Sequence, residues 1–247
     1  MCVVARWDGV GPLALPGSEV YWFVNSSFAN VSYPDVQITI AYPSLSDPDT
    51  EKVMTNLRWL RKDVYDRYCL PNRGKPGFYA RLMLNRPSSR GELTLQTSDM
   101  HDYPLLNPKY FSDERDIQFA VEASKLAVRL LTTRAMKSHG VRLWDIPFPG
   151  CEMFAMYSDE YLACLATQQT SSGLHFVGTC KMGSDRSSVV DPSLKLRGGV
   201  QNLRVVDASV MPNVVSGNTM AAVYMIAAKG AHMILEDNGY CTTAQNN

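Results

Sequence analysis

The stretch that decides the fold runs from Leu174 to Leu235 and reads LHFVGTCKMGSDRSSVVDPSLKLRGGVQNLRVVDASVMPNVVSGNTMAAVYMIAAKGAHMIL. It opens with His175 in a turn-like setting of small and polar residues, and it closes with a long apolar segment that follows Gly217-Asn218-Thr219. Between them, Leu203-Arg204-Val205-Val206 predicts a strand that ends on Asp207. A lone base, a carboxylate at a strand end and a helix N-terminus are parts of a site for an anionic, ring-bearing ligand.

The apolar segment from Thr219 to Leu235 predicts a helix, with Gly239 as its stop. Because apolar residues cover most of its circumference, we expect this helix to be buried. Asn218 precedes it, and a simple N-cap is one interpretation of that residue. In the other interpretation, the free N–H groups of the first turn and the positive end of the helix dipole favour an anion.

His175 and Asp207 also have structural interpretations. A histidine in such a loop is more often a structural or surface residue than a catalytic one, although imidazole is the side chain best suited to take a proton near neutral pH. An aspartate at a strand end commonly caps a turn. The functional interpretation therefore depends on whether these residues occur together.

Length and composition limit the possible classes of protein. The 247 residues suffice for one large or two ordinary domains, and 24 basic residues balance 24 acidic ones. The charge balance gives no sign of binding to nucleic acid or to an anionic membrane. The longest apolar run, Met220 to Ala228, is too short to span a bilayer, and no secretory signal opens the sequence.

A glycine pattern near the start, Gly9-Val10-Gly11-Pro12-Leu13-Ala14, resembles a dinucleotide-binding fingerprint. The fingerprint needs a helix to begin at its turn, and Pro12 followed by Leu15-Pro16-Gly17 leaves no room for one. We therefore interpret it as a loop.

The middle of the chain predicts four strands, in which apolar and polar residues alternate or apolar residues cluster between turn signals. They are expected at Glu19–Val24, Asp35–Ala41, Tyr79–Leu84 and Glu92–Thr97. The second has the alternation of a half-buried strand, and the last two are expected to pair across Arg86-Pro87-Ser88-Ser89-Arg90-Gly91.

Two amphipathic helices are also expected. The first starts at Ser46-Asp47-Pro48-Asp49, and a solvated basic face accompanies its apolar positions. Those positions are Val53, Leu57, Leu60 and Val64, and the basic face comprises Arg58, Arg61 and Lys62. The second spans Asp113 to Leu131, with its N-cap near Ser112. Its expected core stripe comprises Ile117, Ala120, Val121 and Val128.

Three further features have alternative interpretations. The sequons at Asn25 and Asn30 would carry glycans only on an exposed loop of a secreted protein. His101 lies in a polar loop and is interpreted as a surface residue. Cys151 and Cys164 could ligate zinc, but no second Cys-x-x-Cys and no paired histidine accompany them, so a local disulfide or two free thiols is favoured.

The C-terminal pattern resembles the glucose–methanol–choline (GMC) oxidoreductases, and within them the insect-type glucose dehydrogenase branch. The motifs that carry the resemblance are Gly173 to Gly183, Val189-Val190-Asp191-Pro192, Leu203 to Ser209 and Ser216-Gly217-Asn218-Thr219, in that order. Weaker similarity extends upstream through Gly11-Pro12-Leu13, the run from Arg86 to Gly91, and Pro149-Gly150-Cys151.

The resemblance implies a function. Members of the family use FAD and oxidise alcohols or sugars at a CH–OH group by passing a hydride to flavin N5. His175 matches the catalytic histidine that takes the hydroxyl proton, and Asn218 matches the second catalytic position. Asp207 and Ala208 match positions that contact FAD, and Thr219 and Met220 those at which a helix start meets the flavin. Cys151 and Cys164 match a bridged pair.

The resemblance also predicts an α+β fold, with an antiparallel substrate-binding sheet, flanking helices and a C-terminal strand–helix segment of an incomplete FAD-binding domain. Residues 1–18 would form a lead-in loop, 19–168 the substrate-binding domain, 169–240 the catalytic segment and 241–247 a tail. The family's N-terminal Rossmann fingerprint and second glycine-rich signature have no match in the sequence. We therefore expect a truncated chain that binds FAD poorly and turns over slowly.

The expected partner is a small alcohol or sugar, with an electron acceptor that the sequence does not identify. Secretion is suspected from relatives. A non-enzymatic remnant acting as a binding or interaction module is the alternative function. A hydrolase is poorly supported, because the sequence has no Gly-x-Ser-x-Gly elbow and Ser209 has no evident base near it.

Overall fold

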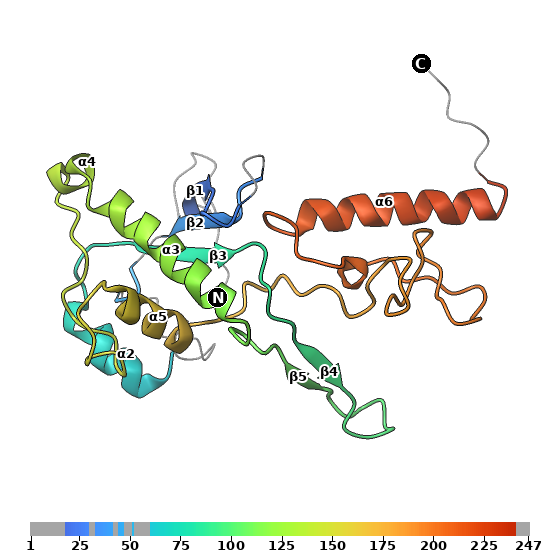
Figure 1. Ribbon diagram of the computed structural model, residues 1–247, viewed down its shortest axis with the longest axis horizontal. Helices are drawn as coiled ribbons and strands as arrows, with labels where there is room; N and C mark the ends of the chain where they lie inside the picture. The colour runs from blue at the N-terminus through green and yellow to red at the C-terminus, as the bar shows by residue number, and fades with distance from the viewer. Residues whose placement is uncertain (1–17, 30–32, 42–43, 47–50, 52–59, 241–247) are drawn as a thin grey trace, which may run out of the picture. The chain divides into compact units, whose positions relative to one another are not determined.

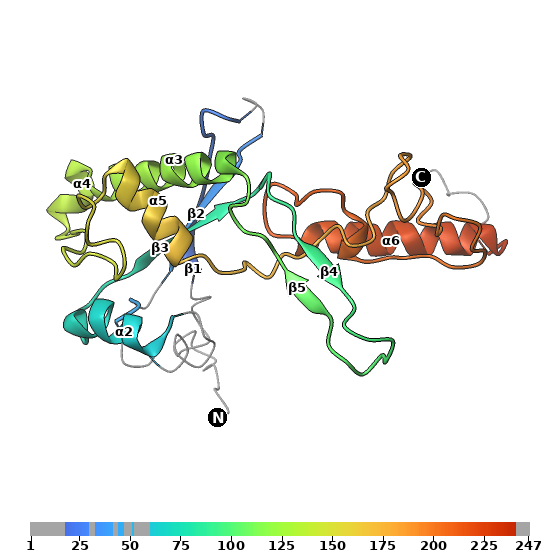
Figure 2. The same ribbon diagram turned by 60° about the horizontal axis from the view of Figure 1, so that its bottom comes forward.

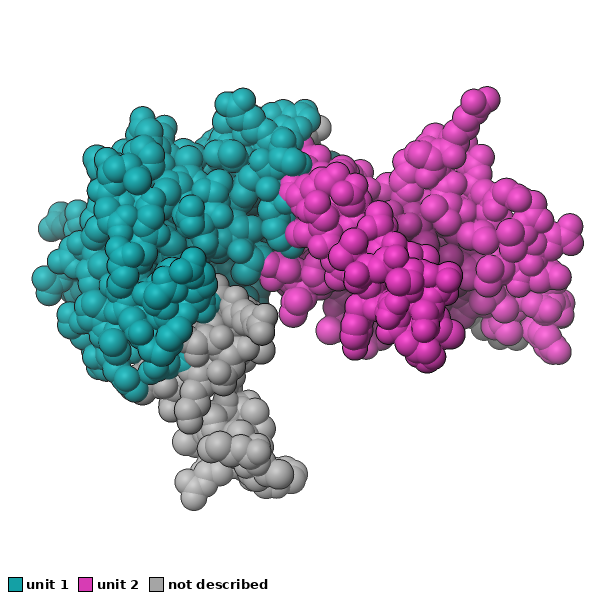
Figure 3. All heavy atoms as spheres, turned by 90° about the horizontal axis from the view of Figure 1, so that it is seen from below, with its two compact units in different colours: residues 1–84, 110–171 teal, residues 85–109, 172–247 magenta. Residues whose placement is uncertain are grey.

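The computed structural model describes residues 18–29, 33–41, 44–46, 51 and 60–240. The predicted loop at residues 9–14, the sequon at Asn30, most of the predicted helix (residues 47–50 and 52–59) and the tail at 241–247 lie outside these residues. Backbone contacts divide the chain into two compact units (Figure 3). The first comprises residues 1–84 and 110–171, and the second comprises residues 85–109 and 172–247. The domain boundaries expected from the sequence stay a prediction.

The first unit contains a three-stranded antiparallel sheet in the order β1-β2-β3 (Figures 1 and 2). Its strands are β1 (Ser18–Val24), β2 (Val36–Ala41) and β3 (Tyr79–Leu84), close to the predicted ranges. The central strand was expected to be half-buried, and this is wrong: Gln37 and Thr39, on the face opposite Val36 and Ile38, are also buried. Alternation distinguishes the two faces of a strand but does not show whether the polar face is covered.

The expected pairing of the strands at Tyr79–Leu84 and Glu92–Thr97 is also wrong. β3 pairs with β2, and β4 (Glu92–Thr94) pairs with β5 (Leu105–Asn107), a strand that the sequence did not predict. The apolar side chains of β3 join the same hydrophobic cluster as those of β2, whereas every residue of β4 and β5 is exposed. Burial of the apolar face therefore favours the β2–β3 pair.

Helix α3 (Glu114–Leu131) covers one face of the sheet, and it begins as predicted. The carboxylate of its N-cap, Asp113, accepts from the Arg115 amide at 3.0 Å. Its buried stripe differs from the predicted one, since Ala120 is buried whereas Ile117, Val121 and Val128 are half-buried. The buried residues are Asp116, Phe119, Ala120, Ala123, Ala127 and Leu131. Small side chains at the contact let the helix approach the sheet closely, so hydrophobicity alone misplaced the stripe.

A second core in the first unit joins α2 (Lys62–Tyr68) and α5 (Asp159–Gln168). The short helix η1 (Leu70–Asn72) follows α2. A further helix, α4 (Arg134–Ser138), follows α3. Of the single helix expected from Ser46 to Val64, the structure describes Glu51 as helical, Leu60 and Arg61 outside any helix, and a new start at α2. The expectation of one continuous helix is therefore wrong at Leu60, which is buried, whereas Val64 of α2 is half-buried. Arg61 and Lys62 are exposed, as expected.

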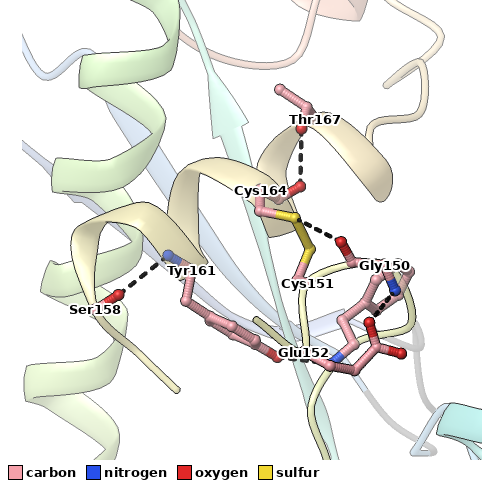
Figure 4. Close-up of a disulfide and its surroundings, with 8 residues drawn as sticks. Gly150, Cys151, Glu152, Ser158, Tyr161, Cys164 and Thr167 are labelled. Carbon is pink, nitrogen blue, oxygen red and sulfur yellow. Dashed lines mark hydrogen bonds between the residues drawn. A yellow bond between two sulfur atoms is a disulfide. The ribbon is translucent and has the colours of Figure 1, made fainter. Parts of the chain in front are cut away.

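Cys151 and Cys164 form a disulfide that joins a loop to α5 (Figure 4), so of the two interpretations that the residues left open, the disulfide is confirmed and the pair of free thiols is wrong. The bond closes a sequence separation of 13 residues. Beside it, the Tyr161 hydroxyl accepts from the Phe148 amide at 2.9 Å. Across the part of the chain that the structure describes, no group of three or more His, Cys, Asp or Glu side chains could hold a metal ion.

The second unit is built around α6 (Met220–Asp237), which lies against irregular segments of residues 182–210 (Figure 1). Ile226 and Met233 of α6 pack on a small core of Val190, Leu194 and Val210. The expectation that α6 is buried is wrong for this chain, because Gly230 is its only buried residue. The apolar character of a helix shows that it can be buried, whereas actual burial requires enough packed chain on every side.

The strand expected at Leu203-Arg204-Val205-Val206 is wrong too. Of these residues only Arg204 takes part in a bridge, an isolated one to Lys195. The Leu196 amide donates to the Leu203 carbonyl, and the Val205 amide donates to the Leu194 carbonyl. These bonds join the apolar run to an irregular segment and not to a strand of a sheet. A short 3₁₀ helix, η2 (Ala208–Val210), follows directly.

The remaining predicted features are located as follows. Asn25 is half-buried, and the neighbouring Ser26 is buried with its hydroxyl donating to Asp35 at 2.6 Å. His101 is exposed, as expected. No helix among the described residues combines the length and the apolar content that crossing a membrane requires.

Candidate functional site

His175 follows a backbone turn at the start of the second unit. Leu174 has a φ of 61°, a left-handed conformation that side chains other than those of Gly, Asn and Asp rarely adopt. The turn is stabilised by Ser172, whose hydroxyl accepts from the Leu174 amide at 2.9 Å. Strained conformations of this kind persist where the surroundings determine them, and they cluster at functional sites. Here the turn orients a half-buried imidazole.

Both nitrogens of His175 have partners at the start of α6. Nδ1 lies 2.8 Å from Oγ1 of Thr219, and Nε2 lies 2.9 Å from Nδ2 of Asn218. The partners are 44 and 43 residues away in the sequence. The structure therefore brings together three of the residues that the sequence singled out.

The two contacts are compatible with either tautomer of the imidazole ring. A hydroxyl and a carboxamide can each donate or accept, so Thr219 and Asn218 can serve a ring proton on Nδ1 or on Nε2. With the proton on Nδ1, that nitrogen donates to the Thr219 hydroxyl oxygen, and Nε2 accepts from the Asn218 amide.

The N-cap of α6 is Thr219, and not Asn218 as the structural interpretation of that residue had it. Thr219 is 9% exposed and has φ −78° and ψ −15°, whereas a capping residue is typically extended. No side chain caps the helix. Because the first N–H groups of a helix have no partner inside it, the start of α6 offers backbone donors and the positive end of a dipole.

The segment that carries Asn218 is tied to the run Arg86-Pro87-Ser88-Ser89-Arg90-Gly91. Arg86 Nε donates to Ser216 Oγ at 2.9 Å, and Arg90 Nη2 donates to Oδ1 of Asn213. From the sequence, this run was predicted only as a turn between two strands and as a weak family motif, and its contacts beside the site were not predicted. The run contains two arginines but no Asp or Glu with which they could pair locally. This was the signal that they bond to another segment.

Asp207 and Ala208 lie at η2, on a segment that contacts the chain just after His175. The Asp207 carboxylate accepts from the Ser209 amide at 2.8 Å, the turn-capping role that the sequence also allowed. The Cys180 amide donates to the Ser209 carbonyl at 3.0 Å, so the two segments run side by side. Met220, the first residue of α6, is 69% exposed. Whether these residues contact a cofactor stays a prediction.

Comparison with known proteins identifies the family. The family profile described as GMC oxidoreductase matches residues 87–227, more than half of the chain. The chain belongs to the GMC oxidoreductase family. FAD is the cofactor of this family.

Among curated relatives of this GMC chain, a glucose dehydrogenase [FAD, quinone] of Drosophila pseudoobscura pseudoobscura is 43% identical over 150 residues, covering 60% of the chain and 24% of that protein. An alcohol dehydrogenase [acceptor] of Pseudomonas putida is 40% identical over 149 residues, covering 60% of the chain and 26% of that protein. The chain thus spans about a quarter of the length of these two relatives.

A solved structure supports the GMC fold. The crystal structure of pyridoxine 4-oxidase from Mesorbium loti matches 90% of this chain and 39% of the oxidase chain, with a TM-score of 0.66 and 24% identity.

The curated relatives are oxidoreductases, which does not favour the alternative of a non-enzymatic binding module.

Proposed function

We propose that this chain supplies the substrate-oxidising segment of an FAD-dependent enzyme that oxidises the CH–OH group of a small alcohol or sugar. The observation that carries the proposal is the contact of His175 with Asn218 and Thr219 at the start of α6. An imidazole nitrogen beside a carboxamide offers both the base and the hydrogen-bond donor that an alcohol requires.

An alcohol can enter this contact without leaving a polar group unpaired. Nε2 of His175 and Nδ2 of Asn218 now bond to each other at 2.9 Å. A substrate hydroxyl can replace that bond, because its proton can be donated to Nε2 while its oxygen accepts from the amide. As Nε2 takes the proton, the oxygen gains negative charge that the Asn218 amide stabilises. Removal of the proton makes the carbon a better hydride donor, and general-base help of this kind typically contributes about 10²–10⁴-fold in rate.

The start of α6 fits the pyrimidine end of a flavin. No side chain caps this helix, and Met220 at its first position is exposed. The backbone N–H groups of Thr219 and Met220 would hold the flavin there, with Asp207 and Ala208 as further contacts. FAD, when bound, accepts the hydride from the substrate carbon. Donors and a helix dipole at that place stabilise the negative charge that the ring system gains.

We also propose that binding of the ADP half of FAD requires sequence beyond these motifs, since no Rossmann fingerprint occurs among the 247 residues. The purified chain is then expected to retain little flavin after dialysis. Strong flavin absorbance in the dialysed chain, with dye-linked alcohol oxidation, would contradict this expectation.

A chimera tests the catalytic proposal. The matched segment of the D. pseudoobscura glucose dehydrogenase is replaced by the corresponding residues of this chain. Dye reduction is then measured with a panel of primary alcohols and aldoses. We expect FAD-dependent oxidation of at least one substrate, lowered about 10²–10⁴-fold by His175→Ala.

The control for the chimera is His101→Ala, because that histidine is exposed and far from α6 in the sequence. A flavin-loaded chimera that oxidises nothing in the panel, or that keeps its rate after His175→Ala, would disprove the proposal.

The disulfide supports the proposal that the protein occupies an oxidising compartment. Cys151–Cys164 would persist in an oxidising environment such as the secretory pathway, which agrees with the suspected secretion. Mass spectrometry of the protein from its native cells, after alkylation of free thiols without reduction, tests this: both cysteines should escape alkylation.

A further inference from the structure

The segment after β1 contains a sequence motif that the proposed function does not use. Asn25-Ser26-Ser27 is a sequon for N-linked glycosylation, and Asn30-Val31-Ser32 is the other one in the sequence. Both lie between β1 and β2. A sequon is modified where its asparagine reaches the surface of a protein that enters the secretory pathway. The structure describes the first of the two, and its surroundings decide whether a glycan fits there.

This first sequon forms a turn at the surface of the first unit. β1 ends directly before Asn25, and the Ala29 amide donates to the Ser26 carbonyl at 3.2 Å, which closes the turn. Ser27 is exposed, and Phe28 is 53% exposed. Asn25 is half-buried, so it retains contact with solvent. The sequon therefore lies on a surface loop, as glycosylation requires.

Two carboxylates hold this turn in place. The amide and the hydroxyl of Ser26 donate to Asp35 at 2.8 and 2.6 Å, and both residues are buried. The amide and the hydroxyl of Ser27 donate to Glu122 of α3, each at 2.7 Å. All four bonds come from the serines, so a sugar on the side-chain amide of Asn25 leaves them intact. The turn and a glycan on Asn25 are therefore compatible.

The bond between Ser27 and Glu122 limits when a glycan can be attached. The glycosyltransferase requires the hydroxyl of the third sequon residue. In the folded chain the Ser27 hydroxyl donates instead to Glu122, which is 95 residues away in the sequence. During synthesis the transferase meets the N-terminal part of a chain first, before the later elements have packed on it. Transfer to Asn25 therefore has to precede the packing of α3.

We propose that Asn25 receives an N-linked glycan when the chain enters the secretory pathway, before α3 packs on the sheet. The donor is an oligosaccharide joined through a diphosphate to a lipid. Nδ2 of Asn25 forms a bond to C1 of the first sugar, the bond from C1 to the diphosphate oxygen breaks, and the amide loses one proton. The modification rests on the oxidising compartment proposed above and on no property of the flavin or of His175.

The test uses the full chain with a cleavable secretion signal, expressed in a eukaryotic cell line. Removal of the glycans by peptide N-glycosidase in H₂¹⁸O converts each modified asparagine to an ¹⁸O-labelled aspartate, which mass spectrometry locates. We expect the label at position 25 in most molecules. Asn25→Gln and Ser27→Ala should abolish it, whereas Ser27→Thr should keep it, because threonine also supplies the hydroxyl. Chain retained in the cells is measured in the same way, so the result does not depend on efficient secretion.

Matched variants separate the sequon from the turn. Ser26→Ala and Glu122→Ala each remove bonds of the turn but keep the sequon, so the label at position 25 should persist in both. Asn30→Gln removes the other sequon and should leave the label at position 25 unchanged. Loss of the label in Ser26→Ala or Glu122→Ala would show that the folded turn is the substrate, which contradicts the proposed order of events.

The order of events is also tested directly. Unglycosylated chain, folded or unfolded and reduced, is incubated with microsomal transferase and lipid-linked oligosaccharide. The unfolded chain should be modified about tenfold faster or more, because in the folded chain the turn has to open first. Equal rates would overturn the order, and an unlabelled position 25 in the cell-derived chain would overturn the site.

Failure of the other proposals gives different results. A labelled position 25 in these experiments, with alkylated Cys151 and Cys164 in the native cells, would reject the proposed compartment alone. None of the measurements involves flavin or alcohol, so an inactive chimera leaves the glycosylation result unaffected.

Discussion

Arg86 and Ser216 are joined by a hydrogen bond of 2.9 Å from Nε to Oγ, across 130 residues of sequence. Ser216 is two residues before Asn218, so this bond anchors the loop that carries a partner of His175. Arg90 strengthens the anchor through Asn213, and its Nη1 also donates to the carbonyl of Pro87 at 2.6 Å. The run from Arg86 to Gly91 thus supports the candidate site from outside it.

Substitution of this pair should show coupling. Arg86→Ala and Ser216→Ala each remove the same bond, so the double variant should lose less stability than the sum of the two single variants. The expected coupling is about 0.5–1.5 kcal/mol, measured by urea unfolding in a double-mutant cycle. Arg67→Ala, combined with Ser216→Ala, is the matched control, because Arg67 pairs with Glu152 in the other unit. Strict additivity in the Arg86 cycle would rule out the anchor.

Gly230→Ala should destabilise the second unit although alanine favours helices. A Cβ at position 230 would lie 2.4 Å from Cγ1 and 3.2 Å from Cγ2 of Val206, a branched and stiff side chain. Overpacking typically costs about 1–3 kcal/mol, against about 1 kcal/mol gained from helix propensity. We expect a net loss of up to about 2 kcal/mol by urea unfolding. Gly230→Ala combined with Val206→Ala should recover part of the loss, and a stabilised single variant would contradict the packing described here.

Reduction of the disulfide should weaken the first unit. Cys151 and Cys164 are 13 residues apart in the sequence. Closing a loop of about 15 residues lowers the entropy of the unfolded chain and thereby raises the free energy of unfolding by about 3 kcal/mol. Dithiothreitol should therefore lower the urea midpoint of the chain, and Cys151→Ser with Cys164→Ser should lower it in the same way. The double variant is also the control, because the reductant should have no further effect on it.

Stability should fall at alkaline pH through Cys69. Burial raises the pKa of its thiol from the ordinary value of 9.0 to about 12. The folded-state pKa lies above the unfolded one, so the unfolded chain releases the proton first as pH rises from about 9 towards 12. The free energy of unfolding should then decrease by at most about 1.4 kcal/mol per pH unit for this group.

The readout for this effect is the difference in slope against pH between the unsubstituted chain and Cys69→Ala. Tyr157, whose pKa burial raises to about 12, contributes to the slope in both proteins and cancels. Equal slopes would show that the Cys69 thiol ionises as readily in the folded chain as in the unfolded one.

Several features of this protein follow from sequence alone, because they depend on local pattern. The alternation in Val36–Ala41 and the capped start at Asp113 specify a strand and a helix without knowledge of their neighbours. The spacing of the motifs from Gly173 to Thr219 was enough to indicate the family, and the pairing of Cys151 with Cys164 followed from the same resemblance.

The tertiary structure decided which groups meet. The sequence could not show that β3 pairs with β2, because period 2 specifies the faces of a strand and not its neighbour. It could not show that α6 is largely exposed, because hydrophobicity measures the gain from burial and not the presence of packed chain. Nor could it assign Thr219 to His175, since a threonine before a helix is by default a cap. Only the fold gave that hydroxyl a different partner, from a segment 44 residues away in the sequence.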